Sequence, residues 1–363
     1  MSKRIHICLV GGEDAHKRID LSKKLLHDNF KVTILGTKDY NYPEDINFIK
    51  YSLKRSLNVV SDIKTVFEYR KIVRENDFDL IQTFDTKPAF LVPLSLFGKK
   101  VIIVRTITGL GKVFINQNLK SLPGRFLYVL LHFIVRNKVQ HTTFQNIEDR
   151  DIFLKNRLIT ASNHSMIYGS GIPLGDIKDI APRNGKVFTV ICVSRLIYEK
   201  GIVNYLEAAK ICSEMGYKIR FMLVGPLEED TTRLNEKILD QYSAYVEWLG
   251  ERKDITDLLK KSHVFALPTF YREGFARVLL EASAVGLPLV TTDVPGVRDI
   301  ARHMKEALIV PIQDSQALAN AIIRLFKDKV LCNTLSKNAL SNVELYSLSV
   351  ISKNYINLYR NLI

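Results

Sequence analysis

Residues 271–293 read YREGFARVLLEASAVGLPLVTTD, which is the pattern of a turn, a helix and a buried strand in succession. Glu273 opens a glycine-containing turn, Glu281 lies two turns into the helix, and Leu289–Thr292 forms the strand. A helix N-terminus presents unpaired N–H groups and the positive end of a dipole, so this turn suits a phosphate or a sugar oxygen. A single glutamate in such a place is more often a helix cap or a solvated side chain. Whether these glutamates bind a ligand therefore depends on which other residues accompany them.

Runs typical of strands alternate with runs typical of helices along the whole chain, which indicates an α/β protein. In the first half the expected strands are Ile5–Val10, Lys31–Leu35, Leu80–Thr83 and Val101–Arg105. In the second half they are Val187–Arg195, Ile219–Val224, Val246–Leu249, Val264–Leu267, Leu289–Thr292 and Leu308–Val310. We therefore predict two doubly wound sheets, one in each half.

The length of 363 residues fits two domains of ordinary size. Residues 168–186, the part richest in glycine and proline, are the expected link. We predict an N-terminal domain over residues 1–172, a C-terminal domain over residues 173–345, and a last helix over residues 346–363 that packs back toward the N-terminal domain. Ligands of doubly wound sheets bind beyond the carboxyl ends of the strands, so polar residues that follow strands are candidates for a site.

The formal net charge is +14, and the basic residues are unevenly spread. Residues 86–147 contain nine lysines and arginines and no aspartate or glutamate. Among them Phe126–Val135 is a largely apolar run of ten residues, too short for a bilayer span, which needs about 20. The run fits a core helix or a helix at a membrane interface, and the charge favours an anionic membrane surface. No zinc ligand set, aromatic RNA-binding run or recognition helix favours nucleic acid.

The four cysteines lie far apart, and their spacing indicates neither a disulfide framework nor a metal site. The N-terminal MSKRIHICLVGG reads as a first strand rather than as a signal peptide. We therefore expect a cytoplasmic protein that associates peripherally with the inner face of the cell membrane.

Two cations follow the first strand of the second half. Arg195 follows the apolar part of that strand, residues 187–193, and Lys200 lies five residues on, just before a helix. Two positive charges beside free N–H groups suit a diphosphate and demand no metal ion, although a basic residue in a loop is usually just solvated. Together with Glu273 and Glu281 they form a set in which the cations hold a pyrophosphate, one carboxylate binds ribose hydroxyls and the other contacts a sugar.

The order of motifs in the second half resembles glycosyltransferase family 4. These motifs are SRLIYEKG at 194–201, LVGP at 223–226, WLG at 248–250 and REGFARVLLEASAVGLPLVTTDVPG at 272–296. The resemblance covers essentially the whole chain and is strongest over 187–300. It implies the GT-B fold, in which two Rossmann-like doubly wound domains face each other across an interdomain cleft. It also implies that the N-terminal domain, residues 1–172, binds the acceptor and that the C-terminal domain, residues 173–345, binds the nucleotide sugar.

The resemblance also implies roles for single residues. Arg195 and Lys200 match the pair that neutralises the donor's diphosphate, and Glu281 matches the glutamate that binds the nucleotide ribose. Gly12 matches the loop that closes over the donor phosphate. Glu273 matches the glutamate near the donor sugar, next to the backbone of Gly274, Phe275 and Ala276. The implied catalytic set is Glu273 with the two cations, acting with retention of anomeric configuration and with no metal or other cofactor.

Further motifs resemble those of the bacterial branch of this family that extends polyprenyl-diphosphate-linked oligosaccharides for O-antigen, capsule or glycoprotein glycans. They are TITGLG at 106–111, FQNIEDRDIF at 144–153 and GSGI at 169–172. The implied activity is transfer of a hexose or an N-acetylhexosamine from a UDP-sugar to a polyprenyl-linked saccharide. GDP-mannose as the donor is the alternative within the family.

The chain departs from the family pattern at two positions. Ala276 stands where many relatives have a proline, and Thr108 stands where many have a histidine. His16 is a speculative substitute for that histidine, although a histidine in such a place is usually just exposed. Asp77 and Asp79 superficially resemble the acidic metal motif of the other major glycosyltransferase fold, but aspartates here commonly end a helix-to-strand loop.

Two other classes stay open on the fold prediction alone. A dinucleotide-dependent oxidoreductase would share the sheets, although Gly11-Gly12 is not followed by the remaining glycines of the dinucleotide fingerprint. A non-catalytic protein that binds a lipid surface would share the basic segment, although it would not need the intact set of two cations and two glutamates.

Overall fold

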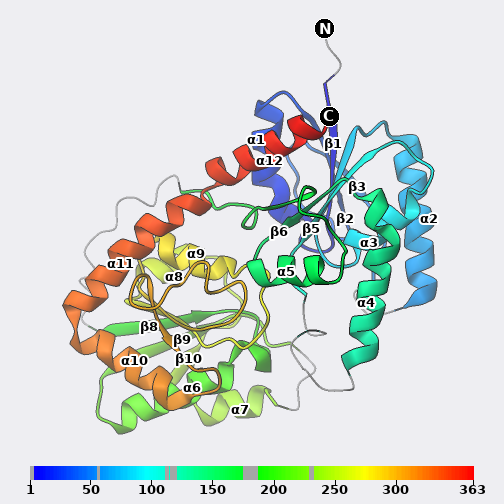
Figure 1. Cartoon of the computed structure of the whole chain (residues 1–363). Coiled ribbons are helices and arrows are strands. Elements are labelled where there is room, and N and C mark those ends of the chain that lie inside the picture. Colours follow the sequence, from blue (N-terminus) through cyan, green and yellow to red (C-terminus); the bar gives the residue numbers. More distant parts are fainter. Residues whose placement is uncertain (1–3, 55–57, 111–113, 115–120, 175–186, 229–232) are drawn as a thin grey trace. The chain divides into compact units, whose positions relative to one another are not determined.

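The computed structural model describes residues 4–54, 58–110, 114, 121–174, 187–228 and 233–363. The chain divides into two compact units, the first over residues 1–173 and 347–363 and the second over residues 174–346. Each unit has one sheet of parallel strands between helices (Figure 1). The predicted class, two Rossmann-like doubly wound domains, is confirmed.

The sheet of the first unit has seven strands in the order β3-β2-β1-β4-β5-β6-β7. They are β1 (His6–Val10), β2 (Lys31–Gly36), β3 (Asn47–Lys50), β4 (Leu80–Thr83), β5 (Ile102–Ile107), β6 (His141–Phe144) and β7 (His164–Met166). The order reverses between β1 and β4, and ligands of doubly wound sheets bind beyond such a switch point. The sequence did not predict β3, β6 and β7, since β3 and β7 are short edge strands and β6 reads HTTF.

Helices cover both faces of this sheet. On one face lie α2 (Val59–Glu75), α3 (Pro88–Ser95) and α4 (Leu122–Val135), whose inward side chains share a core with β1, β4 and β5 (Figure 1). The Asn58 side chain caps α2, and that of Asn146 caps α5 (Ile147–Lys155), each accepting a backbone N–H in the first turn. None of the described helices combines the length and the apolar character that crossing a bilayer requires.

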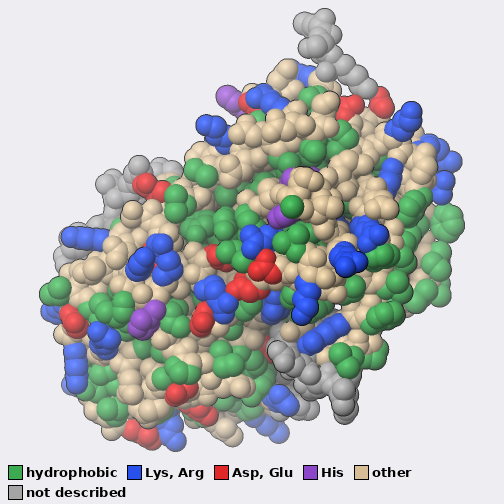
Figure 2. Space-filling view, viewed as in Figure 1, with side chains coloured by type: hydrophobic (Ala, Val, Ile, Leu, Met, Phe, Trp, Pro, Cys, Tyr) green, Lys and Arg blue, Asp and Glu red, His purple; other side chains and the backbone are tan. Residues whose placement is uncertain are grey.

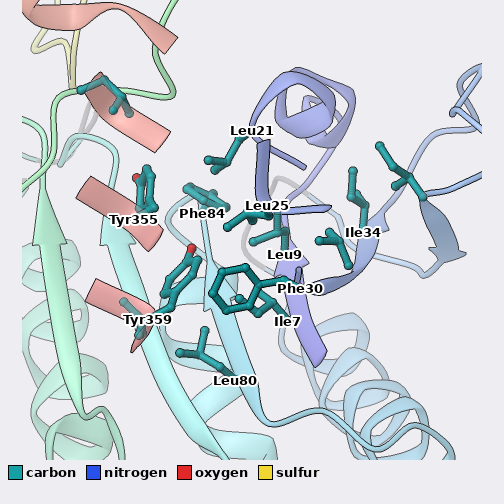
Figure 3. Packing of buried hydrophobic residues seen from close by; sticks show 14 of the residues in the cluster. Ile7, Leu9, Leu21, Leu25, Phe30, Ile34, Leu80, Phe84, Tyr355 and Tyr359 are labelled. Carbon is teal, nitrogen blue, oxygen red and sulfur yellow. The ribbon is translucent and has the colours of Figure 1, made fainter. Parts of the chain in front are cut away.

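On the other face lie α1 (Ile19–His27) and the last helix, α12 (Leu348–Leu362). Tyr355 and Tyr359 of α12 are fully buried with Phe84 and with residues of α1 and β1 (Figure 3). The chain enters α12 past Gly171, whose φ is +76° and whose Cβ, if it had one, would lie 2.6 Å from the Cα of Leu348. Gly171 of the GSGI motif therefore has a structural reason, the close approach of this loop to α12.

The sheet of the second unit has six strands in the order β10-β9-β8-β11-β12-β13. They are β8 (Phe188–Val193), β9 (Ile219–Val224), β10 (Val246–Trp248), β11 (Val264–Leu267), β12 (Leu289–Thr292) and β13 (Ala307–Val310), all within one or two residues of the predicted bounds. The order reverses between β8 and β11, so these two strands define the switch point of this unit.

Six α-helices cover this sheet among the residues described. They are α6 (Ile202–Glu214), α7 (Glu236–Gln241), α8 (Ile255–Lys260), α9 (Arg277–Ala284), α10 (Ser315–Lys327) and α11 (Lys329–Val343). Helix α6 packs against α10, and α9 packs against α11. All four cysteines of the chain are free thiols, and Cys8, Cys192 and Cys212 are buried, which agrees with the absence of a disulfide pattern in the sequence.

Candidate functional site

Arg195 lies two residues beyond β8, in a loop that runs beside the loop after β9. The Leu196 N–H donates to the Pro226 carbonyl at 2.9 Å. This pairing places Glu228 next to Arg195, and the Arg195 Nη1 donates to the Glu228 Oε1 at 2.5 Å. Both side chains are more than one-third exposed, so this ion pair is in contact with solvent and can exchange for another anion.

Lys200 lies in the single 3₁₀ turn Tyr198–Lys200 that precedes α6. Its Nζ donates to the Glu273 Oε1, and only 12% of each side chain is exposed. Thr269, a buried residue just beyond β11, approaches the same carboxylate oxygen with its Oγ1 at 3.4 Å. The cation from the β8 side and the carboxylate from the β11 side therefore meet at the switch point of the second unit.

Backbone contacts hold these two loops together. The Phe270 N–H donates to the Glu199 carbonyl at 2.9 Å. Gly201 follows Lys200 with a φ of +72°, and a Cβ at this position would lie 2.0 Å from the Pro268 carbonyl oxygen. A side chain at residue 201 would force the loops apart, so the close approach of Lys200 to Glu273 depends on this glycine.

The turn after Glu273 presents its backbone in a fixed position. The Ala276 N–H donates to the Gly296 carbonyl at 3.0 Å, and the Phe275 ring packs at 5.3 Å from that of Tyr346. Proline, the residue that the family resemblance leads us to expect here, has no N–H and could not make the bond to Gly296. The departure at Ala276 therefore has a local structural reason. Gly274 lies against Gly296 as well, its carbonyl oxygen 2.7 Å from where a Cβ of Gly296 would be.

Glu281 lies in the second turn of α9, one turn closer to the start of the helix than the sequence predicts. Its Oε1 accepts a hydrogen bond from the Arg277 Nε at 2.9 Å, an i,i+4 pair in which each side chain is 37% exposed. The structure thus brings Arg195, Lys200 and Glu273 to the carboxyl edge around β8 and β11, with Glu281 on the helix that follows β11.

The Tyr271 hydroxyl adds a polar group beside these charges. Its ring centroid lies 5.5 Å from the Lys200 Nζ. Burial and then the charge of Glu273 raise the pKa of Tyr271, against the opposing effect of Arg195. The phenol therefore stays protonated at neutral pH and can donate a hydrogen bond to a ligand oxygen.

The switch point of the first unit holds Gly12 and an aspartate that the sequence did not single out. The Gly12 N–H, beyond β1, donates to the Asp85 Oδ2 at 2.8 Å, and Asp85, beyond β4, has a φ of +74°. Tyr51 donates from its hydroxyl to the Gly11 carbonyl at 2.7 Å. A non-glycine residue with positive φ at a switch point is a sign of function. The signal in the sequence was an aspartate directly after the buried run LIQTF.

The remaining candidate residues of the sequence, His16, Thr108, Asp77 and Asp79, all belong to the first unit. His16 stacks on Tyr40 with ring centroids 4.6 Å apart, and Thr108 directly follows β5. Asp77 and Asp79 precede β4 at the amino edge of the sheet, where the Asp79 Oδ2 accepts the His6 N–H at 2.8 Å. That bond has a structural role, which is the role that the sequence predicted for this pair of aspartates.

Comparison with known proteins decides the class. Residues 175–341 match the family described as glycosyl transferases group 1. The chain is a glycosyltransferase with a group 1 domain. The hypotheses of a dinucleotide-dependent oxidoreductase and of a non-catalytic lipid-surface protein are set aside by this match.

Two relatives that match most of the chain are also named as glycosyltransferases. A Campylobacter jejuni protein, N,N'-diacetylbacillosaminyl-diphospho-undecaprenol alpha-1,3-N-acetylgalactosaminyltransferase, is 26% identical over 372 residues, which cover 97% of either chain. An Escherichia coli protein, UDP-Gal:alpha-D-GlcNAc-diphosphoundecaprenol alpha-1,3-galactosyltransferase, is 26% identical over 312 residues, which cover 82% of this chain and 78% of the relative.

Solved structures share the architecture of this glycosyltransferase. Sucrose-phosphate synthase from Thermosynechococcus elongatus superposes with a TM-score of 0.81 at 20% identity, covering 99% of both chains. Anabaena HepE in complex with UDP and glucose gives a TM-score of 0.78 at 18% identity, covering 99% of this chain and 100% of HepE. At these identities the likeness establishes the fold alone, which is of the GT-B type.

Proposed function

We propose that this glycosyltransferase moves a hexose or an N-acetylhexosamine from a UDP-sugar to a polyprenyl-diphosphate-linked saccharide. The proposed binding of the nucleotide-sugar donor is supported by one observation above all. Lys200 contacts Glu273 at the β8–β11 switch point, and Arg195 lies in the adjoining loop. The proposed acceptor is supported by two relatives whose names specify a diphospho-undecaprenol-linked sugar. The product would serve assembly of a cell-surface polysaccharide or glycan.

In this proposal the donor's diphosphate binds at the carboxyl edge of the second unit's sheet. Arg195 and Lys200 neutralise it, and the N–H groups at the start of α6 face the same edge. Phosphate oxygens replace the exposed carboxylate of Glu228 on Arg195. Glu281 accepts hydrogen bonds from the ribose hydroxyls.

Transfer would proceed with retention, by attack on the same face of the sugar that the leaving group departs from. The bond from the anomeric carbon to the phosphate oxygen breaks while the bond to the acceptor oxygen forms, and the departing phosphate oxygen takes the acceptor's proton. Positive charge grows on the sugar and negative charge on the diphosphate. Arg195 and Lys200 stabilise the second of these charges, and Glu273 orients the sugar. No metal ion is needed, because the two cations supply the countercharge.

The direct test is a transfer assay with a synthetic polyprenyl-diphosphate-linked saccharide, a panel of UDP-sugars and GDP-mannose, and EDTA throughout. We expect one UDP-sugar to be consumed in EDTA and the new linkage to keep the donor's anomeric configuration by NMR. Turnover with GDP-mannose alone would move the donor to that nucleotide. An inverted product, or activity that returns only with a divalent cation, would contradict the mechanism.

We also propose that the enzyme works at the cytoplasmic face of the membrane as a peripheral protein on an anionic surface. The support is the acid-free segment 86–147 together with the lipid-linked acceptors of the relatives. The segment is less basic at its surface than the sequence indicates. Arg105 is fully buried, and Lys87 is paired with Asp62, so neither is available to a membrane.

A further inference from the structure

Two helices of the first unit expose apolar side chains that none of the described residues of that unit covers. Helices α2 and α4 both pack against α3, on the same face of the sheet. Tyr69 and Ile72 of α2 and Val135 of α4 point into the core. The opposite sides of the two helices face solvent, and Figure 2 shows hydrophobic side chains gathered along the right-hand margin, over these helices.

The exposed apolar residues follow the helical repeat. We call them the α2–α4 apolar surface, and its principal residues are Val60, Ile63 and Phe67 of α2 and Phe126, Leu130 and Phe133 of α4. Phe67 is 66% exposed and Phe126 is 70% exposed. Spacings of three and four residues put each set on one side of its helix. Scattered apolar residues are normal on a surface, but a stripe on each of the two helices that pack against α3 indicates a binding face.

Basic residues continue both stripes. On α2 the exposed side goes on from Phe67 to Arg70, Lys71 and Arg74, all exposed. At the end of α4 the Arg136 guanidinium lies 3.7 Å from the centroid of the Phe133 ring. Cations thus lie beside the apolar side chains toward the end of each helix. On α2 the last residue, Glu75, pairs with Lys71, whereas α4 has no acidic residue at all. Apolar side chains flanked by cations are the pattern of helices that lie in the interface of an anionic bilayer.

The direction of the helices places one end of this surface toward the switch point of the first unit. Each helix joins two parallel strands, so it runs back from the carboxyl edge of the sheet to the amino edge. The first residues of α2 and α4 therefore lie toward the edge where Gly12 and Asp85 meet. A lipid-linked saccharide that leaves the bilayer beside this surface would have a short path to that edge.

We propose that the α2–α4 apolar surface is the face by which the enzyme docks on a bilayer containing anionic lipid. The inference deepens the proposed function, on which it rests for the lipid-linked acceptor. The outward side chains of both helices enter the interface, and the cations at the helix ends contact the headgroups. A second copy of the chain is the other candidate occupant. Symmetric pairing would bring mainly like charges together, because α4 has no acidic residue and α2 exposes Lys64, Arg70, Lys71 and Arg74 against Glu75.

The test is sedimentation of the full chain with vesicles of phosphatidylethanolamine and phosphatidylglycerol, against vesicles of phosphatidylcholine alone. The double variant Phe67→Ser/Phe126→Ser should lose at least about tenfold in apparent partitioning to the anionic vesicles. The matched control is Val330→Ser/Leu345→Ser, two residues of the second unit that are 78% and 63% exposed, and it should bind as the unaltered chain does. Arg70→Ser/Lys71→Ser should lose about fivefold for each charge, and less at high salt.

Transfer to a water-soluble acceptor with a short prenyl chain separates this proposal from the proposed function. The Phe67→Ser/Phe126→Ser variant should keep that activity and the far-ultraviolet circular dichroism of the unaltered chain. Equal vesicle binding by this variant and the unaltered chain would overturn the docking proposal, as would failure of the unaltered chain to bind anionic vesicles. So would a dimer in light scattering that the variant converts to a monomer. Loss of transfer in every variant and the unaltered chain would instead count against the proposed function.

Discussion

The ammonium group of Lys200 contacts the carboxylate of Glu273 across the switch point between β8 and β11, although the two residues are 73 positions apart in the sequence. Because only 12% of each side chain is exposed, the pair lies where electrostatic interactions are stronger than at the open surface. A donor diphosphate placed against Lys200 would have the Glu273 carboxylate beside its sugar.

Glu273→Gln should separate sugar orientation from nucleotide binding. The amide keeps the shape of the side chain but removes the negative charge that orients the sugar and contacts Lys200. We expect kcat to fall by about 10²–10³-fold while the Kd for UDP changes by less than about threefold. Steady-state kinetics with the identified UDP-sugar and calorimetric titration with UDP give the two values. Unaltered turnover would remove Glu273 from the proposed catalytic set.

Glu228→Gln should tighten nucleotide binding. The Glu228 carboxylate holds the Arg195 guanidinium, and a diphosphate has to replace it. Solvent-exposed pairs of this kind contribute about 0.2–1 kcal/mol, so the Kd for UDP should fall by up to about fivefold. Glu247→Gln, which breaks the similarly exposed pair with Arg220, is the control and should leave the Kd unchanged. A weaker affinity in Glu228→Gln would mean that Glu228 supports the bound state of Arg195 instead.

Gly201→Ala should destabilise the second unit more than a strained glycine position alone explains. Its φ of +72° resembles the +84° of Gly216, but a Cβ at 201 would meet the Pro268 carbonyl, whereas a Cβ at 216 would meet nothing within 4 Å. We expect losses of about 3 kcal/mol for Gly201→Ala and about 1 kcal/mol for Gly216→Ala in denaturant unfolding. Equal losses would contradict the packing of residue 201 against the loop after β11.

Stability should fall as the pH drops below about 6.5, the ordinary pKa of a histidine. Burial, and then the charge of Arg105, hold the pKa of His132 well below that value, and the His132 Nδ1 lies 2.8 Å from the Arg105 Nη1. Folded His132 stays neutral while the unfolded chain binds a proton there, so acid favours unfolding by up to about 1.4 kcal/mol per pH unit.

His132→Gln tests this origin, since the amide oxygen can still accept from Arg105 and does not titrate. Unfolding free energies at pH 7 and pH 5 should differ less in the variant than in the unaltered chain. His141, whose pKa burial and then His164 lower to about 4, contributes to the slope in both proteins. An unchanged difference between the two pH values would show that His132 does not cause the acid sensitivity.

The sequence predicted the second unit better than the first, for a physical reason. The strands of the second unit are continuous apolar runs buried on both faces, as in Phe188–Val193, and such runs are visible without a structure. In the first unit β3 is half exposed at an edge, and β6 is largely polar in composition yet buried, with Thr143 making a hydrogen bond to Thr106. Neither has the apolar run or the alternation that marks a strand.

Contacts between loops were beyond the reach of the sequence. Arg195 and Lys200 follow a recognisable strand, but their pairing with Glu228 and Glu273 depends on how three loops approach one another. Helix α4 shows a different limit, since it is apolar on nearly all sides and periodicity could not tell its core side from its exposed side. The burial of Arg105 has the same cause, because a basic residue within a strand gives no sign that its charge is enclosed.

The central claim is that Arg195 holds the donor's diphosphate, and calorimetric titration of UDP into matched arginine variants tests it most directly. Arg195→Ala removes an exposed, ion-paired arginine at the carboxyl edge of the sheet, and Arg220→Ala removes an equally exposed, ion-paired arginine near the start of β9. The account predicts a Kd for UDP about 10- to 100-fold weaker in Arg195→Ala and unchanged in Arg220→Ala. Equal affinities in the two variants would contradict it.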